Sequence, residues 1–89
     1  MTNKKTLKKS IKLICEELFV ECVAASLYSA KGHRDDAEAL LFTIIKTQAD
    51  YTSRISHPEP GLPAKVYFRD LRDKFTARVT ELIDQINNL

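Results

Sequence analysis

Residues 11–30 read IKLICEELFVECVAASLYSA, and fourteen of these twenty residues are apolar. A helix turns by about 100° per residue, so side chains three or four positions apart lie on one face. One such face carries Leu7, Ile11, Ile14, Leu18, Cys22 and Ala25, and Cys15 and Phe19 widen it on one side. The spacing predicts an amphipathic helix over about residues 5–31.

The same segment carries a second line of apolar residues, about 180° around the helix from the first. Its members are Leu13, Val20, Ala24 and Leu27, with Val23 at its flank. In a three-helix bundle each helix meets its neighbours across one sector, which cannot cover two opposite faces. Aligned apolar residues on the surface of a small domain are typical of an interface. We therefore expect a two-fold homodimer through the back of this helix.

Two further helices are predicted, over about residues 36–56 and 63–87. The expected buried face of the second helix is Ala37, Leu41, Ile44, Ile45, Gln48, Thr52 and Ile55, flanked by Leu40, Phe42, Ala49 and Tyr51. That of the third helix is Ala64, Phe68, Leu71, Phe75, Val79, Leu82, Ile86 and Leu89. Neither shows an apolar line on its back. Short connections favour an all-α, up-down-up antiparallel bundle, formed by residues 1–89 as a single domain.

The connections contain residues that end and begin helices. Gly32 suits the position after the C-terminus of the first helix, and Asp35 is the expected N-cap of the second. Residues 57–63 read HPEPGLP, and three prolines in this segment exclude a helix. Pro60 and Gly61 fit the centre of a type II turn, and Pro63 suits the start of the third helix. We interpret the segment as a stiff elbow.

Composition indicates a globular domain. The chain has 89 residues, of which 29% are charged, and a net charge of +2, which does not demand a polyanionic partner. Lys12 and three glutamates interrupt the apolar run, which argues against a signal peptide and against a membrane span. Cys15 and Cys22 are separated by about 10 Å along one helix, too far for a disulfide between them. We expect buried thiols in a reducing cytoplasm.

The sequence shows no catalytic or metal-binding pattern. His33, Asp35 and Asp36 belong to the first connection, whereas His57 and Glu59 belong to the second, about 36 Å away along the intervening helix. These residues cannot share a metal ion within one chain. The chain has only two glycines, so it has no glycine-rich phosphate loop, and neither cysteine has a neighbouring base. We expect no cofactor, no metal and no catalytic residue.

Three functions remain open, and the first is favoured. It is a non-enzymatic helical module for self-association or protein–protein interaction, with no membrane partner. The second is a nucleic-acid-associated protein that uses a lysine-rich N-terminal arm: Lys4, Lys5, Lys8, Lys9 and Lys12. No aromatic residue or arginine interleaves with these lysines. The third is a small ligand binder or enzyme with a pocket at a subunit boundary near Gln48, Tyr51 or Tyr67.

Overall fold

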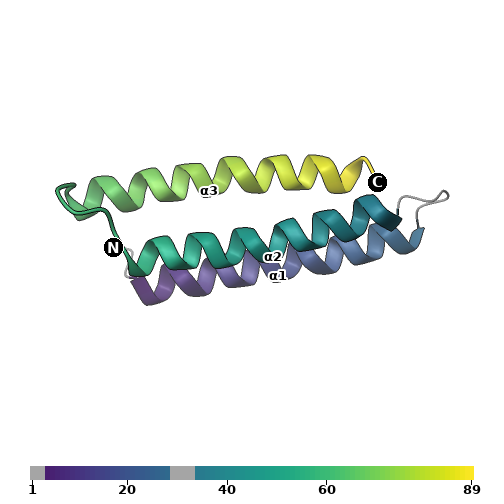
Figure 1. The fold of residues 1–89 in the computed structure, drawn as a ribbon, viewed down its shortest axis with the longest axis horizontal. Helices are drawn as coiled ribbons and strands as arrows, with labels where there is room; N and C mark the ends of the chain where they lie inside the picture. The colour runs from purple at the N-terminus through teal and green to yellow at the C-terminus, as the bar shows by residue number, and fades with distance from the viewer. Residues whose placement is uncertain (1–3, 29–33) are drawn as a thin grey trace.

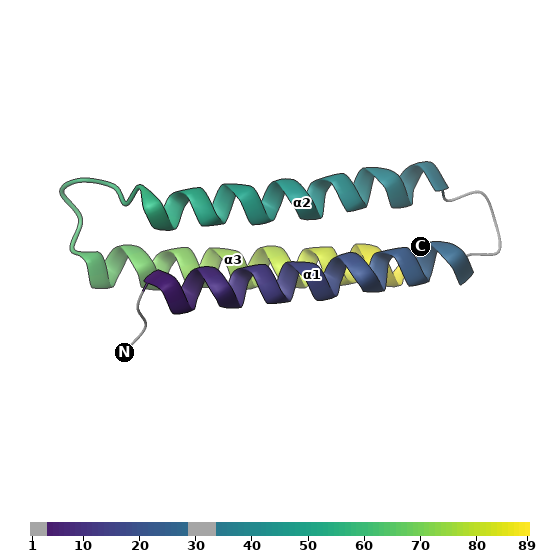
Figure 2. The ribbon, with the colours of Figure 1, turned by 90° about the horizontal axis from the view of Figure 1, so that it is seen from below.

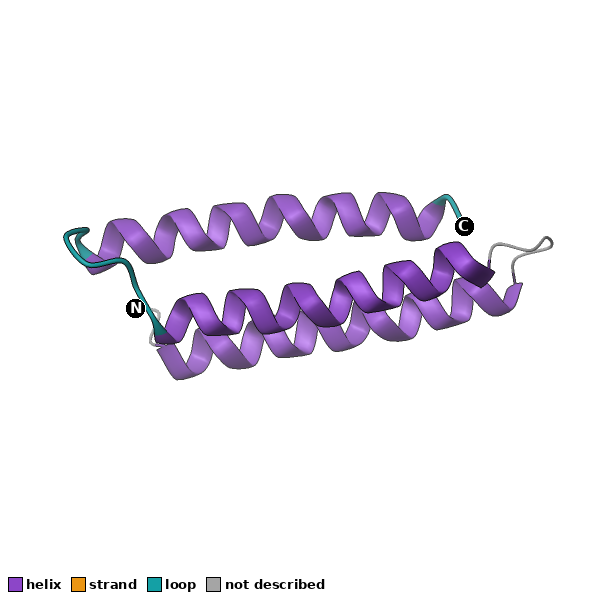
Figure 3. Cartoon of the chain, in the orientation of Figure 1, coloured by secondary structure: helices purple, strands orange, loops and turns teal. Residues whose placement is uncertain are grey.

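A computed structural model describes residues 4–28 and 34–89, which form three helices (Figure 1). Helix α1 spans Lys4–Tyr28, α2 spans Arg34–Ser56 and α3 spans Ala64–Asn87. These described residues contain no strand, which confirms the predicted all-α class (Figure 3). All three helices follow the 49 Å long axis, and the chain runs one way along α1 and α3 and the opposite way along α2 (Figure 2).

The helix boundaries differ slightly from those that the sequence predicts. Helix α2 begins at Arg34, so Asp35 lies inside its first turn instead of capping it. Its negative charge still interacts favourably with the helix dipole there. Pro63 precedes α3, and its carbonyl oxygen accepts the Tyr67 N–H at 3.0 Å. Gly61 has a φ of 91°, as the third position of a type II turn requires. The predicted helix end at Gly32 lies outside the described residues.

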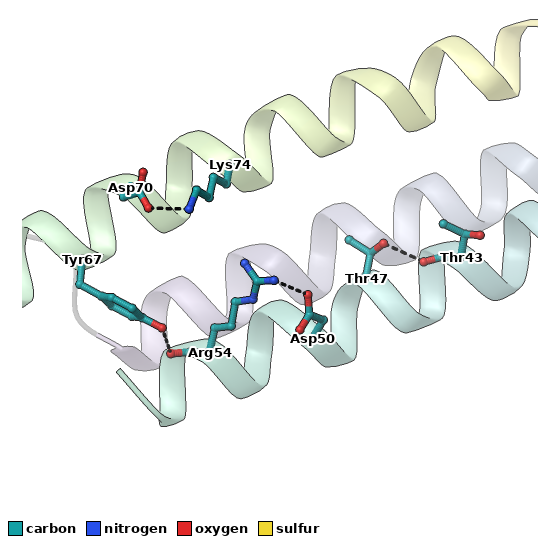
Figure 4. Close-up of polar contacts among 7 residues, drawn as sticks. All are labelled: Thr43, Thr47, Asp50, Arg54, Tyr67, Asp70 and Lys74. Atoms are coloured by element: carbon teal, nitrogen blue, oxygen red, sulfur yellow. Dashed lines mark hydrogen bonds and ion pairs between the residues drawn. The ribbon is translucent and has the colours of Figure 1, made fainter. Parts of the chain in front are cut away.

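The core runs the length of the bundle between the three helices. Helix α1 contributes Leu7, Ile11, Cys15, Leu18 and Cys22; α2 contributes Ala37, Leu40, Ile44, Tyr51 and Ile55; and α3 contributes Leu71, Phe75, Leu82 and Ile86. Thr47 is also buried, and its hydroxyl donates to the Thr43 carbonyl oxygen at 2.7 Å (Figure 4). This hydrogen bond lets a polar side chain occupy the core without an unsatisfied donor.

Helices α1 and α2 form the most extensive contact of the bundle. Small residues allow this contact: the Cys22 Sγ lies 3.8 Å from the Ala37 carbonyl oxygen, and both residues are buried. Helix α3 contacts the pair less extensively and through larger side chains. The rings of Tyr51 and Phe75 meet edge to face at 5.2 Å, and the Tyr67 hydroxyl donates to the Arg54 carbonyl oxygen at 2.9 Å (Figure 4).

The buried face of α2 is rotated by about 60° from the face that apolar spacing predicts. Ile45, which we expected in the core, is 57% exposed, and Phe42, which we placed at its flank, is 70% exposed. Thr47 and Tyr51 are buried in their place. The expected placement of Ile45 in the buried face of the second helix, with Phe42 at its flank, is therefore wrong. The reason is physical: the Tyr51 ring packs on α3, and the Thr47 hydroxyl finds its acceptor within its own helix.

This rotation predicts that two lysine substitutions on α2 differ in their effect on stability. Thr47→Lys places a charge in the core and lowers the free energy of unfolding by at least about 2 kcal/mol. Ile45→Lys leaves it within about 0.5 kcal/mol, because the new side chain extends into solvent. Urea unfolding, at a protein concentration low enough for the chain to be monomeric, measures both. A larger loss for Ile45→Lys would contradict the observed face.

Candidate interaction surface

The second apolar line of α1 lies outside the core. Leu13, Val20 and Leu27 are 55%, 65% and 77% exposed, and Ala24 is exposed as well. Val23, at the flank of this line, is half-buried. The opposite face of the same helix is buried along its whole length, from Leu7 to Cys22. Helix α1 therefore presents apolar side chains to its own bundle and, separately, to the surroundings.

The contacts of α1 show which of its edges faces α3. Ile11 and Ile14 line a cavity of about 310 Å³ together with Phe75 and Thr76 of α3. Phe19 and Val23 are 140–180° around the helix from Ile14. Because of this angle, Phe19 and Val23 lie on the edge of α1 that is turned away from α3. Both are half-buried there.

The contacts of α2 orient its faces in the same way. Tyr51 packs on Phe75, so this side of α2 faces α3. Ala37 faces α1, because its carbonyl oxygen contacts Cys22. Leu41 lies about 40° beyond Ala37 in the direction away from Tyr51, and Ile45 and Phe42 follow further around the helix. These residues therefore lie on the side of α2 that α3 does not cover.

Val20 and Leu27 of α1 and Phe42 and Ile45 of α2 are exposed and thus lie on one side of the helix pair. Ile14 and Tyr28 are exposed as well, but they lie on the edge of α1 nearer to α3. Helix α3 lies on the other side of the pair (Figure 1). We call the side that α3 does not cover the outer face. It comprises Val20, Val23 and Leu27 of α1, with Leu13 and Ala24 at its rim, and Leu41, Phe42 and Ile45 of α2. Apolar spacing indicates the α1 half of this face but not the α2 half. It places Ile45 in the core because spacing alone does not show which part of a wide apolar arc meets the neighbouring helices.

The lysines of the predicted arm lie on the first turns of α1, which is helical from Lys4 onward. Lys8 is half-buried, and Lys4, Lys5, Lys9 and Lys12 are exposed. Within residues 4–28 and 34–89 none of the five forms an ion pair. They spread over about 140° of the helix surface, and Lys5, Lys9 and Lys12 lie toward the outer face.

The third candidate site is a cavity of about 430 Å³ beside the HPEPGLP segment. Tyr67 lines it, but Gln48 and Tyr51, which we had grouped with Tyr67, are not among its lining residues. The charges around it are neutralised locally, by the Asp70–Lys74 pair at 3.0 Å and the Asp50–Arg54 pair at 3.1 Å (Figure 4). Glu59 also lines the cavity and belongs to neither pair. One carboxylate is fewer than the several convergent polar groups that orient a bound ligand.

The described residues hold little else that could carry chemistry. In this part of the chain no group of three or more His, Cys, Asp or Glu side chains could hold a metal ion. Cys15 and Cys22 are free and buried, and burial raises the pKa of both thiols above the ordinary value of 9.0. A thiol that stays protonated is a poor nucleophile. No helix within the described ranges is long and apolar enough to cross a membrane.

The raised pKa values predict a loss of stability at alkaline pH. As pH rises through about 9, thiols in the unfolded chain ionise while the buried thiols keep their protons, which favours unfolding by at most about 1.4 kcal/mol per pH unit for each thiol. Urea unfolding between neutral pH and about pH 10 measures the loss. The double variant Cys15→Ala, Cys22→Ala should lose less over the same range. An equal loss in both proteins would show that other groups cause it.

Comparison with protein-family models, with curated proteins and with solved structures found no match to this chain.

Proposed function

We propose that this protein is a non-enzymatic self-association module, in which an up-down-up antiparallel three-helix unit forms a two-fold homodimer through the back of α1. The observation that carries the proposal is the exposure of Leu13, Val20 and Leu27, each more than half exposed, on a helix whose opposite face is fully buried. In a two-fold dimer the same surface of both copies forms the interface, so the apolar line of one copy packs against the apolar line of the other. The two free thiols support a reducing compartment such as the cytoplasm.

The size of this apolar line indicates a weak dimer. Full burial of a valine or leucine side chain contributes about 1.5–3 kcal/mol, and a two-fold interface buries each residue twice. Association costs about 4–15 kcal/mol in lost translational and rotational freedom. Six half-exposed side chains supply a gain of the same order as this cost. A dissociation constant of about micromolar corresponds to a net gain of about 8.2 kcal/mol, which these side chains alone do not supply. We therefore expect an affinity of this order from a dimer that covers further apolar surface beside them.

Sedimentation equilibrium tests this function directly. The wild type should dimerise at about micromolar concentration, and Val20→Lys, Leu27→Lys should be monomeric because two charges per copy would be buried without partners. The matched control is Thr76→Lys, Thr80→Lys, which adds the same charge on exposed positions of α3 and should still dimerise. Circular dichroism must show that all three proteins are folded. A folded wild type that stays monomeric up to about 100 times that concentration would refute the proposal.

Nucleic-acid binding is the second candidate, and it is favoured by the lysines at the start of α1, which form no ion pair with any other described residue. A dimer would carry two such clusters. If this function holds, the protein binds a labelled oligonucleotide at low salt, and affinity falls steeply as salt rises. Replacing Lys5, Lys9 and Lys12 by glutamine should then weaken the binding. If the wild type binds neither DNA nor RNA at low salt, only the self-association function remains.

A further inference from the structure

We propose that the dimer interface extends onto α2, and that the second copy docks antiparallel, with the lysine-rich end of one outer face against the acidic end of the other. This inference rests on the proposed self-association. It goes beyond it by assigning the Phe42 and Ile45 side chains to the interface and by setting the relative direction of the two copies.

The apolar surface of α2 supplies the first argument. Phe42 is 70% and Ile45 is 57% exposed, and both lie on the same side of the α1–α2 pair as Val20 and Leu27. An aromatic side chain is among the largest contributors to interface energy. An interface restricted to α1 would leave Phe42 and Ile45 in water beside it, whereas one across both helices buries a continuous apolar face.

The distribution of charge along the outer face supplies the second argument. Lys5, Lys9 and Lys12 lie near the start of α1. Asp35 and Glu38 lie near the start of α2, which is beside the end of α1 because Cys22 contacts Ala37. None of these five charged residues forms an ion pair within the described part of its own chain. Arg34 is exposed at the same end of α2, so Asp35, Glu38 and Arg34 together carry a charge of −1, against +3 for the three lysines. The outer face is therefore basic at one end and weakly acidic at the other.

This charge pattern indicates which partner binds the outer face and in which direction the partner lies. A two-fold axis perpendicular to the helices places the basic end of each copy opposite the acidic end of the other, so two attractive contacts form. A two-fold axis parallel to the helices places like charges together at both ends. A partner of uniform charge would be repelled at one end. The outer face is therefore complementary to a second copy of this chain in the antiparallel direction.

The first experiment tests the α2 half of the interface without adding charge. Phe42→Gln, Ile45→Gln should raise the dissociation constant at least about tenfold in sedimentation equilibrium, because its apolar contacts are lost. The control Thr76→Gln, Thr80→Gln should not change it. If Val20→Lys, Leu27→Lys abolishes the dimer while the α2 variant dimerises like the wild type, self-association stands and the extension onto α2 is wrong.

The second experiment tests the direction by exchanging charges. Lys12→Glu makes the basic end of the outer face less basic and leaves the acidic end unchanged. Glu38→Lys removes the negative charge of the acidic end and leaves the basic end unchanged. In an antiparallel dimer each variant alone should associate about 3–10-fold more weakly than the wild type, because each weakens an attractive contact in both symmetric halves. An equimolar mixture should recover part of the loss, since the two variants carry complementary charges.

Salt dependence distinguishes the two directions in the wild type. Raising NaCl from about 50 mM to about 500 mM screens surface charges, so the dissociation constant of an antiparallel dimer should increase by about 3–10-fold. A parallel dimer, with like charges opposed, should tighten instead. Tightening with salt, or a mixture no stronger than either variant alone, would overturn the antiparallel arrangement while leaving the α1 interface intact.

Discussion

The close packing of α1 against α2 is the contact on which the rest of the structure depends. Small side chains such as Cys22 and Ala37 let the two helices approach, and this pair has the most extensive contact in the bundle. A pair of helices has two open sides, and the described residues form one more helix, α3, which can cover one of them. Helix α3 lies on one side, so the other side presents whatever residues α1 and α2 carry there (Figure 1).

Between the charged residues at its two ends, this side of α1 and α2 carries several exposed apolar side chains. A single exposed leucine or phenylalanine is ordinary on a protein of this size, because apolar atoms make up more than half of most protein surfaces. Here Val20, Leu27, Phe42 and Ile45 come from two adjacent helices and lie on the same side of them. Apolar residues gathered on one side of a small domain are typical of interfaces. In the proposed dimer, the charges at the two ends of this surface set the relative direction of the two copies.

The cavity beside the HPEPGLP segment and the two buried thiols are not part of this surface. The larger cavity is bordered by Arg54, Asp70 and Lys74, which form ion pairs, and by Glu59. The buried thiols keep their protons because burial raises their pKa. The polar contacts that the structure does show serve the fold. The Tyr67 hydroxyl joins α3 to α2, and the Arg54 guanidinium lies 4.9 Å from the centre of the Tyr51 ring.

The sequence by itself determined the number and type of the helices, because apolar residues at three- and four-residue spacing, interrupted by HPEPGLP, leave little alternative. It also indicated which residues of α1 lie outside the core, since two apolar lines on opposite faces cannot both turn inward. Tertiary structure decided which part of the wide apolar arc of α2 is buried. Tyr51 packs on Phe75 and Thr47 bonds to Thr43, and these contacts turn Ile45 outward. Periodicity could not show this, because it describes one helix alone. Contacts with the neighbouring helices decide which part of the apolar arc is buried.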